Sequence, residues 1–392
     1  MLKIRQHNQL SSPDISLFLD NLEEGGVQRA IVNLARGFLA QGLKVDIVLQ
    51  RAEGPFIKQV PPSVKIVDLR SPRLRASVGV LADYLRQAQP KAMLASIHYS
   101  TEIAILAKYW AKSSTKIVVC EQGSLGPLQK MRVPINNPLA FLGLTPDRPT
   151  SLVKYFYPWA DGIVAVSQGA AEDLAHVGNL SLKDIQVIYN PVITPDLIGK
   201  ASEPIEHPWF ADKEIPVILS VGRLVPQKDF PTLIQGFAKT LKLYTSRLVI
   251  LGSGPDRAQL EELIHELGLE ENVALLGHVQ NPYKYMAQSS VFVLSSVWEG
   301  LGNVLIEAMA MGTPVISTNC KSGPSEILAN GQYGHLTPVG DSDALAEAIL
   351  DVLSGHPKLV EPDWLHQFGL ETATQKYLKV LGLSAMEFAT SN

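Results

Sequence analysis

Two cations lie five residues apart in the segment VGRLVPQKD at 221–229, which follows an apolar run. Arg223 offers a planar fork of N–H donors and Lys228 a mobile ammonium group, and both suit the oxygen atoms of a diphosphate. A charged loop after a strand is also common as plain solvated surface. The spacing therefore leaves two interpretations open, a diphosphate site and an ordinary loop.

A second group of polar residues lies in SSVWEGLGNVLIEAMAM at 295–311. Gly300 and Gly302 leave the backbone bare before a predicted helix, whose first N–H groups can bind phosphate oxygens. Glu299 precedes this helix and Glu307 lies about one turn inside it, so both carboxylates can accept hydrogen bonds from one sugar or ribose. The apolar neighbours of Glu307 predict a buried carboxylate with partners, and a surface helix residue is the alternative.

Two shorter features follow other apolar runs. Gly25 and Gly26 separate a predicted strand from a predicted helix, which lets an anionic ligand approach the backbone, although a glycine pair is more commonly a simple turn. His98 and Glu121 each follow a predicted strand. In such a position each residue can contact a ligand or serve the structure alone, and both interpretations stay open.

No pattern in the sequence predicts a metal site. Asp341 and Asp343 have the Asp-x-Asp spacing that can hold a metal-bound diphosphate, but they directly precede an amphipathic run. We therefore interpret them as a helix cap. His and Cys residues show no zinc-ligand spacing. The glycines of GSGP at 252–255 lack the third glycine of a dinucleotide fingerprint and predict packing or a turn.

The elements that must position these residues alternate along the chain. Apolar runs predict strands, and helical patterns of 10–15 residues separate them, which is typical of parallel sheets covered on both faces. The pattern restarts after residue 215, so we predict two doubly wound α/β domains, with ligands beyond the carboxyl ends of the strands. The predicted strands are 15–19, 45–49, 64–69, 92–97, 117–120, 163–166, 217–221, 248–251, 273–276, 291–294 and 315–317. The predicted helices include 27–40, 78–89, 232–241, 257–267, 307–311 with its flanks, 344–353 and 368–383.

A proline-rich segment predicts the domain boundary. Residues 190–216 contain five prolines and few periodic apolar residues, which favours a linker with a hinge near 191–214. The predicted domains are therefore 1–190 and 191–367, followed by a C-terminal helical segment, 368–392.

Composition bounds the class of protein. The chain has 392 residues, 46% hydrophobic and 18% charged, which predicts folded domains. The two cysteines fit a reducing compartment, and no apolar run has the length of a membrane span or of a signal peptide. We expect a soluble or peripherally attached intracellular protein.

The net charge of −4 is unevenly distributed. Residues 1–190 carry 21 Lys/Arg and 15 Asp/Glu, whereas residues 191–392 carry 13 and 23. The positive half suits an anionic membrane or substrate, and ordinary scatter over a large surface is the alternative. No basic block interleaved with aromatic residues predicts a nucleic-acid partner.

Taken together, these motifs resemble those of the retaining glycosyltransferases of family 4, which have the GT-B fold. The specific part is the glutamate pair inside EGLGNVLIEAMAMGTPVIST at 299–318, together with GRLVPQKD at 222–229. Weaker similarities cover nearly the whole chain in the order of the family. They are GGVQRAIVNLA at 25–35, AVSQGAAEDL at 165–174, VIYNPV at 187–192, LGSGPDRAQLEEL at 251–263 and SGPSEIL at 322–328.

The resemblance implies a role for each matching residue. Arg223 and Lys228 would bind the donor diphosphate, Glu299 the donor sugar and Glu307 the ribose hydroxyls. His98 matches the histidine expected near the donor sugar. The backbone positions implied in donor binding are Gly25, Gly26, Gly222, Gly300, Leu301, Gly302 and Asn303. The final helix, 368–383, would cross back onto the first domain.

The resemblance also implies the reaction. A hexose or N-acetylhexosamine would pass from a nucleotide-diphosphate sugar, with UDP as first choice, to a hydroxyl of a lipid-linked or polysaccharide acceptor, with retention of configuration. Cations and a helix N-terminus would stabilise the leaving diphosphate without a metal ion, so we expect no cofactor and no dedicated general base. A nucleotide-sugar epimerase or phosphorylase of the same fold, or a two-domain binding protein, is the alternative.

The composition of the predicted acceptor domain indicates where in the cell the protein would act. Residues 108–158 carry seven Lys/Arg against two acids, with Phe141, Leu142, Phe156 and Trp159 in or beside them. This composition favours a cytoplasmic protein docked peripherally on the inner face of a membrane, where it would reach a lipid-linked acceptor. A soluble acceptor in a basic pocket is the alternative.

Overall fold

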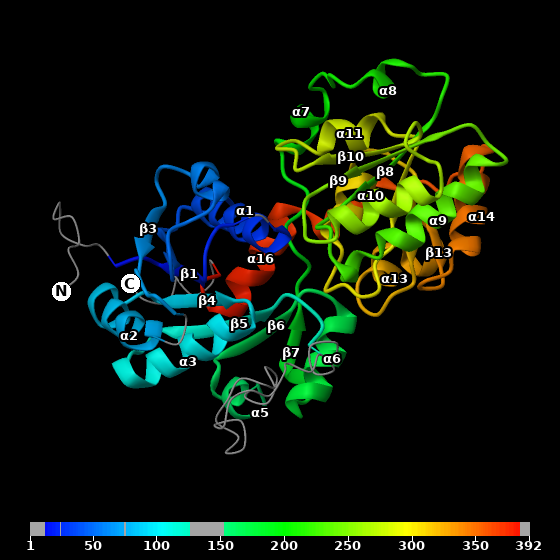
Figure 1. The fold of residues 1–392 in the computed structure, drawn as a ribbon. Helices are drawn as coiled ribbons and strands as arrows, with labels where there is room; N and C mark the ends of the chain where they lie inside the picture. Colours follow the sequence, from blue (N-terminus) through cyan, green and yellow to red (C-terminus); the bar gives the residue numbers. More distant parts are fainter. Residues whose placement is uncertain (1–11, 24, 74–75, 126–152, 385–392) are drawn as a thin grey trace. The chain divides into compact units, whose positions relative to one another are not determined.

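The computed structural model describes residues 12–23, 25–73, 76–125 and 153–384. Contacts between Cα atoms divide the chain into two compact units (Figure 1). Unit 1 comprises the described parts of Met1–Ala165, Leu174–Ile188 and Thr374–Asn392, and unit 2 comprises Val166–Asp173 and Tyr189–Ala373. Each unit contains one parallel sheet with its own buried core.

Unit 1 is built on a seven-stranded sheet in the order β3-β2-β1-β4-β5-β6-β7, with every pair parallel. Its strands are β1 (Ile15–Leu19), β2 (Val45–Leu49), β3 (Lys65–Asp68), β4 (Ala92–Ser96), β5 (Lys116–Glu121), β6 (Gly162–Ala165) and β7 (Ile185–Val187). Its helical segments are α1 (Gly26–Ala40), η1 (Pro55–Gln59), α2 (Ser77–Ala88), α3 (His98–Ala111), α5 (Val153–Phe156), η4 (Tyr157–Trp159), η5 (Leu182–Asp184) and part of α6 (Gln168–Gly178).

The strand order of unit 1 reverses between β1 and β4. Because parallel crossovers are right-handed, this reversal places α1 on one side of the sheet and α2 with α3 on the other (Figure 1). The loops after β1 and β4 therefore begin at neighbouring carboxyl ends.

Unit 2 repeats this plan with six parallel strands in the order β10-β9-β8-β11-β12-β13. They are β8 (Val217–Val221), β9 (Arg247–Leu251), β10 (Val273–Gly277), β11 (Val291–Leu294), β12 (Val315–Thr318) and β13 (His335–Thr337). Its helices are α7 (Leu197–Ala201), α8 (Pro208–Ala211), α9 (Phe230–Leu241), α10 (Arg257–Glu266), α11 (Tyr283–Gln288), α12 (Asn303–Ala310), α13 (Pro324–Ile327), α14 (Ser342–Leu353) and α15 (Pro362–Leu365), with the 3-10 turns η6 (Pro226–Lys228), η7 (Ala329–Gly331) and η8 (His366–Phe368).

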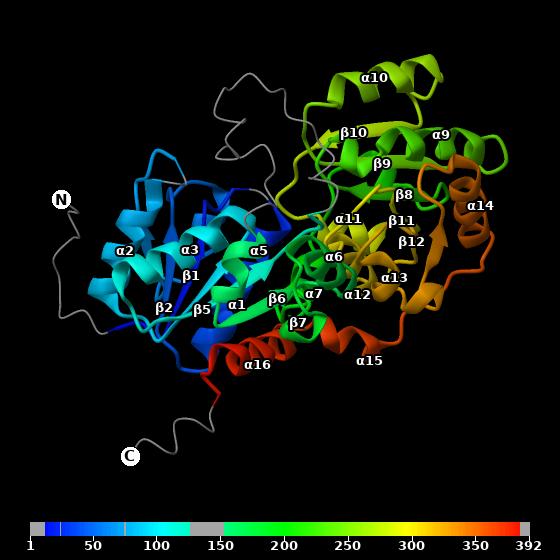
Figure 2. The same ribbon diagram turned by 90° about the horizontal axis from the view of Figure 1, so that it is seen from below.

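The core of unit 2 explains why these residues form helices around a sheet. Apolar faces of α9 and α14, including Phe237 and Leu345, pack with strand residues Ile218, Leu248 and Val293, all fully buried. Figure 2 shows α9 and α14 next to each other on the sheet of unit 2. The strand order reverses between β8 and β11, so the loops at 222–229 and 295–302 leave neighbouring carboxyl ends, where open parallel sheets bind ligands.

The last helix, α16 (Leu370–Leu381), extends from one contact unit into the other. Two residues before it, the Phe368 carbonyl at the end of η8 accepts hydrogen bonds from the N–H groups of Val192 and Ile193 in unit 2. Further on, the Tyr377 hydroxyl lies 3.2 Å from Cys120 Sγ at the end of β5 in unit 1. Burial raises the pKa of the Cys120 thiol to about 12.

The predicted fold class is confirmed, because two doubly wound parallel sheets are present. The expected strands all occur within a residue or two of their predicted ends, whereas β7 and β13 were not predicted. Each of these two edge strands has three residues, too few to establish a hydrophobic period.

Domain ranges and hinge position stay predictions. Residues 166–173 make their contacts in unit 2, and the proline-rich segment 191–214 also lies wholly in unit 2, where it forms α7 and α8. No helix among the described residues is both long and apolar enough to cross a membrane. Phe141 and Leu142 lie outside the described residues.

Candidate functional site

The loop after β8 carries Arg223 and Lys228, the two cations predicted to bind a diphosphate. Arg223 is exposed and makes no ion pair or hydrogen bond with its side chain to the described residues. The loop ends at Asp229, whose carboxylate caps α9 by accepting from the N–H and hydroxyl of Thr232. A guanidinium held at a strand end and left available is suited to an anionic ligand.

Glycine residues let this loop pack closely on its neighbour. Gly252 has φ +141°, and a Cβ there would lie 1.8 Å from the carbonyl oxygen of Gly222. A Cβ on Gly254 would lie 2.2 Å from the Leu224 carbonyl oxygen. The packing interpretation of GSGP is therefore confirmed, and Gly222 itself lies against the Lys228 side chain.

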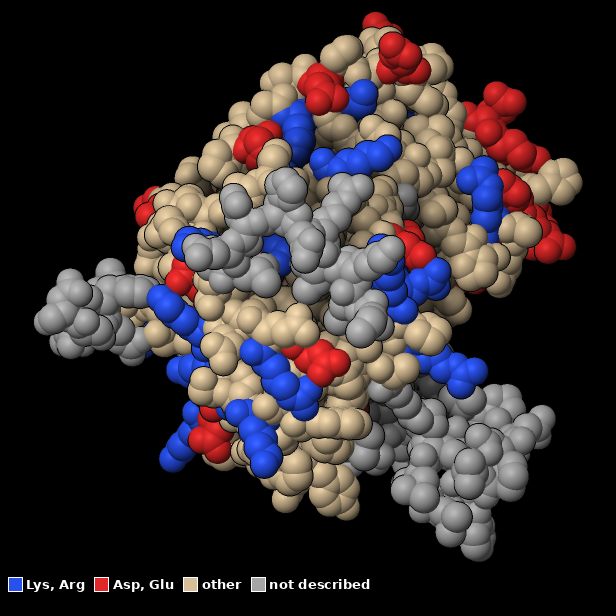
Figure 3. Space-filling model, turned by 90° about the vertical axis from the view of Figure 1, so that its left-hand side faces the viewer, with Lys and Arg blue, Asp and Glu red and all other residues tan. Residues whose placement is uncertain are grey.

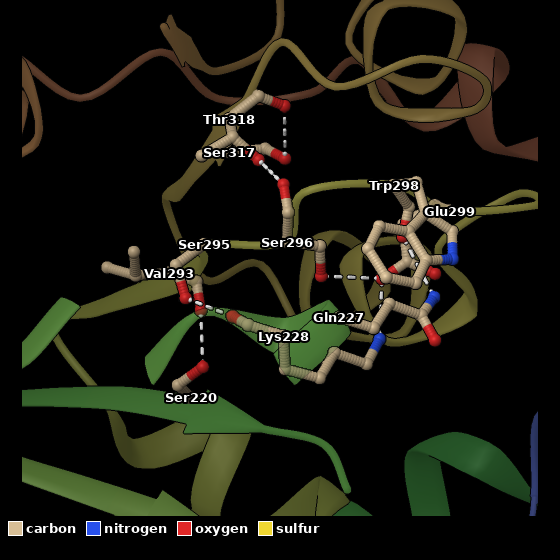
Figure 4. A network of polar contacts seen from close by, with 10 residues as sticks. All are labelled: Ser220, Gln227, Lys228, Val293, Ser295, Ser296, Trp298, Glu299, Ser317 and Thr318. Atoms are coloured by element: carbon tan, nitrogen blue, oxygen red, sulfur yellow. Dashed lines mark hydrogen bonds and ion pairs between the residues drawn. The ribbon is translucent and has the colours of Figure 1, made fainter. Parts of the chain in front are cut away.

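Lys228 is tied to Glu299 across the two loops. The Lys228 Nζ lies 2.5 Å from Glu299 Oε1, and the side chains are only 15% and 9% exposed. The hydroxyl of Ser296 donates to the same oxygen at 2.7 Å (Figure 4). A cation and a carboxylate from separate strand ends thus form one largely buried pair.

Further hydrogen bonds fix the backbone around this pair. The hydroxyl of Ser295 donates to the Lys228 carbonyl at 2.7 Å, and the Gln227 amide donates to the Trp298 carbonyl at 2.8 Å (Figure 4). The Thr318 hydroxyl on β12 donates to the Ser296 carbonyl at 2.5 Å. The two loops at the β8/β11 switch point are therefore held together before any ligand binds.

The glycine-rich segment 300–302 leads into α12. Gly302 is its N-cap with φ +97° and has no side chain to satisfy the first N–H groups of the helix. Leu301 is buried, and a Cβ on Gly323 would lie 1.9 Å from the Leu301 carbonyl oxygen. Close packing by Gly323 thus supports a segment whose first-turn N–H groups, from Asn303 on, suit phosphate oxygens.

Glu307 lies one turn inside α12, as expected. It is 5% exposed, and the Tyr283 hydroxyl donates to its Oε1 at 3.3 Å. The predicted burial is confirmed, and the surface alternative is wrong. Sequence reasoning missed Tyr283, since nothing in the one-dimensional pattern pairs α11 with α12.

In unit 1, the predicted glycines lie at the start of α1. The helix begins at Gly26, and Gly25 is its N-cap in an extended conformation without a side-chain cap. A Cβ on Gly25 would lie 2.4 Å from Gln28 Oε1. The first turn of α1 contains no acidic residue.

His98 is the first residue of α3, which the sequence analysis did not predict. It follows Ile97, whose φ of +74° is strained for a β-branched residue. This turn places the backbone of His98 near the carboxyl end of β4, adjacent to β1 in the sheet. The side chain of His98 lies outside what the structure describes.

Glu121 is buried and hydrogen-bonded to neighbouring protein groups. It is 3% exposed, and its Oε1 accepts from the N–H groups of Gln122 and Gly123. The Tyr157 hydroxyl donates to its Oε2 at 3.1 Å. Burial first, and then the Glu121 charge, raise the pKa of Tyr157 well above its usual value. Of the two open interpretations of Glu121, the contacts favour the structural one.

The cap interpretation of Asp341 is confirmed. Its carboxylate accepts from the N–H groups of Asp343 and Ala344 at the start of α14. The described residues contain no cluster of three or more His, Cys, Asp or Glu side chains that could hold a metal ion.

Comparisons with known proteins identify the class. Residues 24–194 match the family described as Glycosyltransferase Family 4, and residues 202–362 match Glycosyl transferases group 1. Anabaena HepE, solved in complex with UDP, has a TM-score of 0.73 at 20% identity, covering 94% of this chain and 99% of that chain. The two units thus have the fold of the GT-B glycosyltransferases. The chain belongs to glycosyltransferase family 4.

Two curated relatives extend the comparison. An N-acetylgalactosamine-N,N'-diacetylbacillosaminyl-diphospho-undecaprenol 4-alpha-N-acetylgalactosaminyltransferase of Campylobacter jejuni is 39% identical over 203 residues, 52% of this chain and 53% of the relative. The chain thus spans about half the length of that relative. The lipopolysaccharide core biosynthesis glycosyltransferase LpsE of Rhizobium meliloti is 27% identical over 92% of this chain and 96% of LpsE.

Proposed function

We propose that this protein transfers a hexose or N-acetylhexosamine from a UDP-sugar to a hydroxyl of a lipid-linked or polysaccharide acceptor, with retention of configuration. The observation that carries the proposal is the convergence of Arg223, the Lys228–Glu299 pair and the start of α12 at one switch point. The names of the Campylobacter and Rhizobium relatives support the acceptor class, and the UDP complex of HepE supports the nucleotide.

The proposed chemistry follows from charge. Breaking the bond between sugar and phosphate leaves negative charge on the diphosphate, which Arg223, Lys228 and the N–H groups at the start of α12 would stabilise. Lys228 would be shared between Glu299 and the phosphate, so that its position is set before the donor binds. We expect these groups to stabilise the leaving diphosphate without a metal ion.

The other residues would position the two substrates. Glu299 would accept hydrogen bonds from the donor sugar, and Glu307, held by Tyr283, from the ribose hydroxyls. His98 would contact the donor sugar, and the backbone at Gly25 and Gly26 the diphosphate and acceptor. We assign no general base, because the leaving phosphate would itself assist deprotonation of the acceptor.

A peripheral membrane contact is part of the proposal. Four aromatic side chains of unit 1 are each more than half exposed, and we call this set the aromatic patch: Tyr109, Trp110, Tyr155 and Trp159. The rings of Tyr109 and Trp159 pack edge to face with centroids 5.4 Å apart, which joins the end of α3 to η4. Exposed Trp and Tyr side chains suit the interfacial region of a bilayer.

Cations accompany the aromatic patch. Lys112 follows α3 directly, Lys154 lies over the ring of Tyr155, and Lys108 is paired with Asp161 at 2.5 Å. Figure 3 shows Lys and Arg side chains on one face of the molecule, with several Asp and Glu side chains among them. Lysines beside the aromatic patch suit a cytoplasmic membrane face that carries anionic lipids.

The test of the donor site is nucleotide binding. Calorimetry of UDP, GDP and ADP in EDTA should show binding of UDP, with an affinity that Arg223→Ala lowers at least tenfold, about 1.4 kcal/mol. Arg257→Ala is the matched control, because Arg257 lies on α10 of the same unit and pairs with Glu261. Absence of UDP binding, or binding indifferent to Arg223, would contradict the assignment. UDP-sugars would then be tested for transfer.

A further inference from the structure

A short segment outside the predicted donor domain packs on the glycine-rich loop. Residues 166–173 follow β6 in the chain, yet their contacts belong to unit 2. They comprise Val166, Ser167 and the first part of α6. We call this segment the α6 bracket. Its contacts with the rest of unit 2 described below reach Gly300 or the segment 321–326, which includes the start of α13.

Ser167 holds the glycine-rich loop directly. Its hydroxyl donates to the Gly300 carbonyl at 2.5 Å and accepts from the Ala170 N–H at 3.0 Å. Ser167 is fully buried, so water cannot replace either bond. Because the hydroxyl oxygen accepts a hydrogen bond from the Ala170 N–H, the hydroxyl proton points to the Gly300 carbonyl. The carbonyl of Gly300 therefore faces the bracket, which fixes the orientation of its peptide plane.

Glu326 on α13 holds the other end of the bracket. Its two carboxylate oxygens accept from the N–H groups of Gln168 and Gly169, at 2.7 and 2.8 Å. These are first-turn donors of α6, which lack partners inside the helix and favour a negative charge. Burial and the Glu326 charge raise the pKa of Tyr189, whose hydroxyl lies 3.4 Å from the carboxylate, to about 12.

Two further contacts limit movement between the bracket and the loop 321–326. Lys321 Nζ lies 2.7 Å from Asp173, a residue that is 2% exposed. A Cβ on Gly169 would lie 2.7 Å from the Cα of Ser322, so two backbones touch at this point. Because Gly323 packs on the Leu301 carbonyl in turn, the bracket reaches both Gly300 and Leu301.

We propose that Ser167 and Glu326 are positioning residues of the donor site. They fix the peptide groups of Gly300 and Leu301, so that the N–H groups leading into α12 are aimed at the donor diphosphate before it binds. Because these N–H groups are already oriented, the loop need not lose conformational entropy when the diphosphate binds or when the transition state forms. The inference rests on the proposed function, since it assumes that this loop binds the diphosphate.

The test compares UDP with uridine. Ser167→Ala removes one hydrogen bond at the loop and should weaken UDP binding about fivefold while the affinity for uridine, measured by competition, stays unchanged. Glu326→Gln places an amide donor against the N–H groups of α6 and should act in the same direction. Ser325→Ala, on the same helix and bonded to Asn330, is the matched control.

The close backbone contact between Gly169 and Ser322 offers a second, independent test of the proposal. Gly169→Ala should weaken UDP binding by more than Ser167→Ala, because its Cβ must push against the Ser322 backbone. Gly199→Ala, in α7 with open space around its Cβ, is the control. Amide hydrogen exchange of residues 300–303 in the ligand-free protein should be faster in the bracket variants than in the controls.

The outcomes are distinct. If the wild-type protein binds UDP and the bracket variants match it in UDP affinity and in exchange at 300–303, the inference is overturned and the proposed function stands. If the variants lose UDP and uridine affinity equally, the effect is general unfolding of the unit, and the positioning role is overturned. If the wild-type protein binds no nucleotide, the proposed function is overturned and this inference with it.

Discussion

Breaking the buried pair of Lys228 and Glu299 should destabilise unit 2 by far more than breaking a surface pair. The Nζ–Oε1 distance is 2.5 Å, and the Glu299 side chain is 9% exposed. Lys228→Met would leave the Glu299 carboxylate buried with Ser296 as its one remaining hydroxyl donor among the contacts in Figure 4. Loss of one partner of such a pair costs about 3 kcal/mol. Glu299→Gln should cost less, because Lys228 is 15% exposed and reaches water more easily.

The double-mutant cycle isolates the pairwise term. The combined variant should be less destabilised than the sum of the single variants, with a coupling energy of about 2 kcal/mol. Urea unfolding of the ligand-free protein supplies the free energies. Lys239 and Asp343 give a matched control pair, because they lie 2.6 Å apart in the same unit but are 39% and 79% exposed. Their coupling should be about 0.5 kcal/mol or less.

A coupling energy for Lys228 and Glu299 equal to that of the control pair would refute this reasoning. It would mean that burial does not strengthen the contact, and Lys228 would then be as free to move as a surface lysine. The proposed sharing of Lys228 between Glu299 and a diphosphate would lose its basis as well.

Three further predictions concern other parts of the chain. Gly323→Ala should lower UDP affinity at least tenfold because its Cβ meets the Leu301 carbonyl, whereas Gly340→Ala, at a similar positive φ in open space, should not. Cosedimentation of the protein with vesicles should require anionic lipid and the side chains of the aromatic patch. Tyr244→Ala in unit 2 should leave it unchanged. Equal binding to neutral vesicles would contradict the proposed membrane contact. Cys120 and Cys320 should resist thiol reagents at pH 8 in the folded protein and react on unfolding. Burial raises the pKa of each thiol to about 12, which disfavours the reactive thiolate at pH 8. Rapid labelling of the native protein would contradict this.

Local patterns predicted the elements that carry their own signal. The apolar runs that became β1, β8 and β11 are fully or almost fully buried, and each ends at a loop that carries candidate site residues. A buried parallel strand needs continuous apolar residues, so its composition alone marks it. The burial of Glu307 was predictable for the same reason, because every adjacent position along its helix is apolar.

The sequence could not predict which residues from distant segments meet. Ser167 and Gly300 are 133 positions apart, and Gln168 and Glu326 are 158 apart. The segments AVSQGAAEDL and SGPSEIL stood out only by resemblance, and no property of either segment indicated that a serine and a carboxylate in them would lie on one loop. Tyr283 and Glu307 meet in the same way, through the packing of α11 on α12.

By itself, the sequence therefore determined the alternation of strands and helices, the two-sheet architecture and the residue types available at the strand ends, because these depend on hydrophobic period and local backbone preference. The tertiary structure alone decided that Lys228 is paired, that Arg223 is exposed and that the α6 bracket holds the glycine-rich loop. Those facts depend on the order of strands in each sheet and on contacts between segments far apart in the chain, and a one-dimensional pattern contains neither.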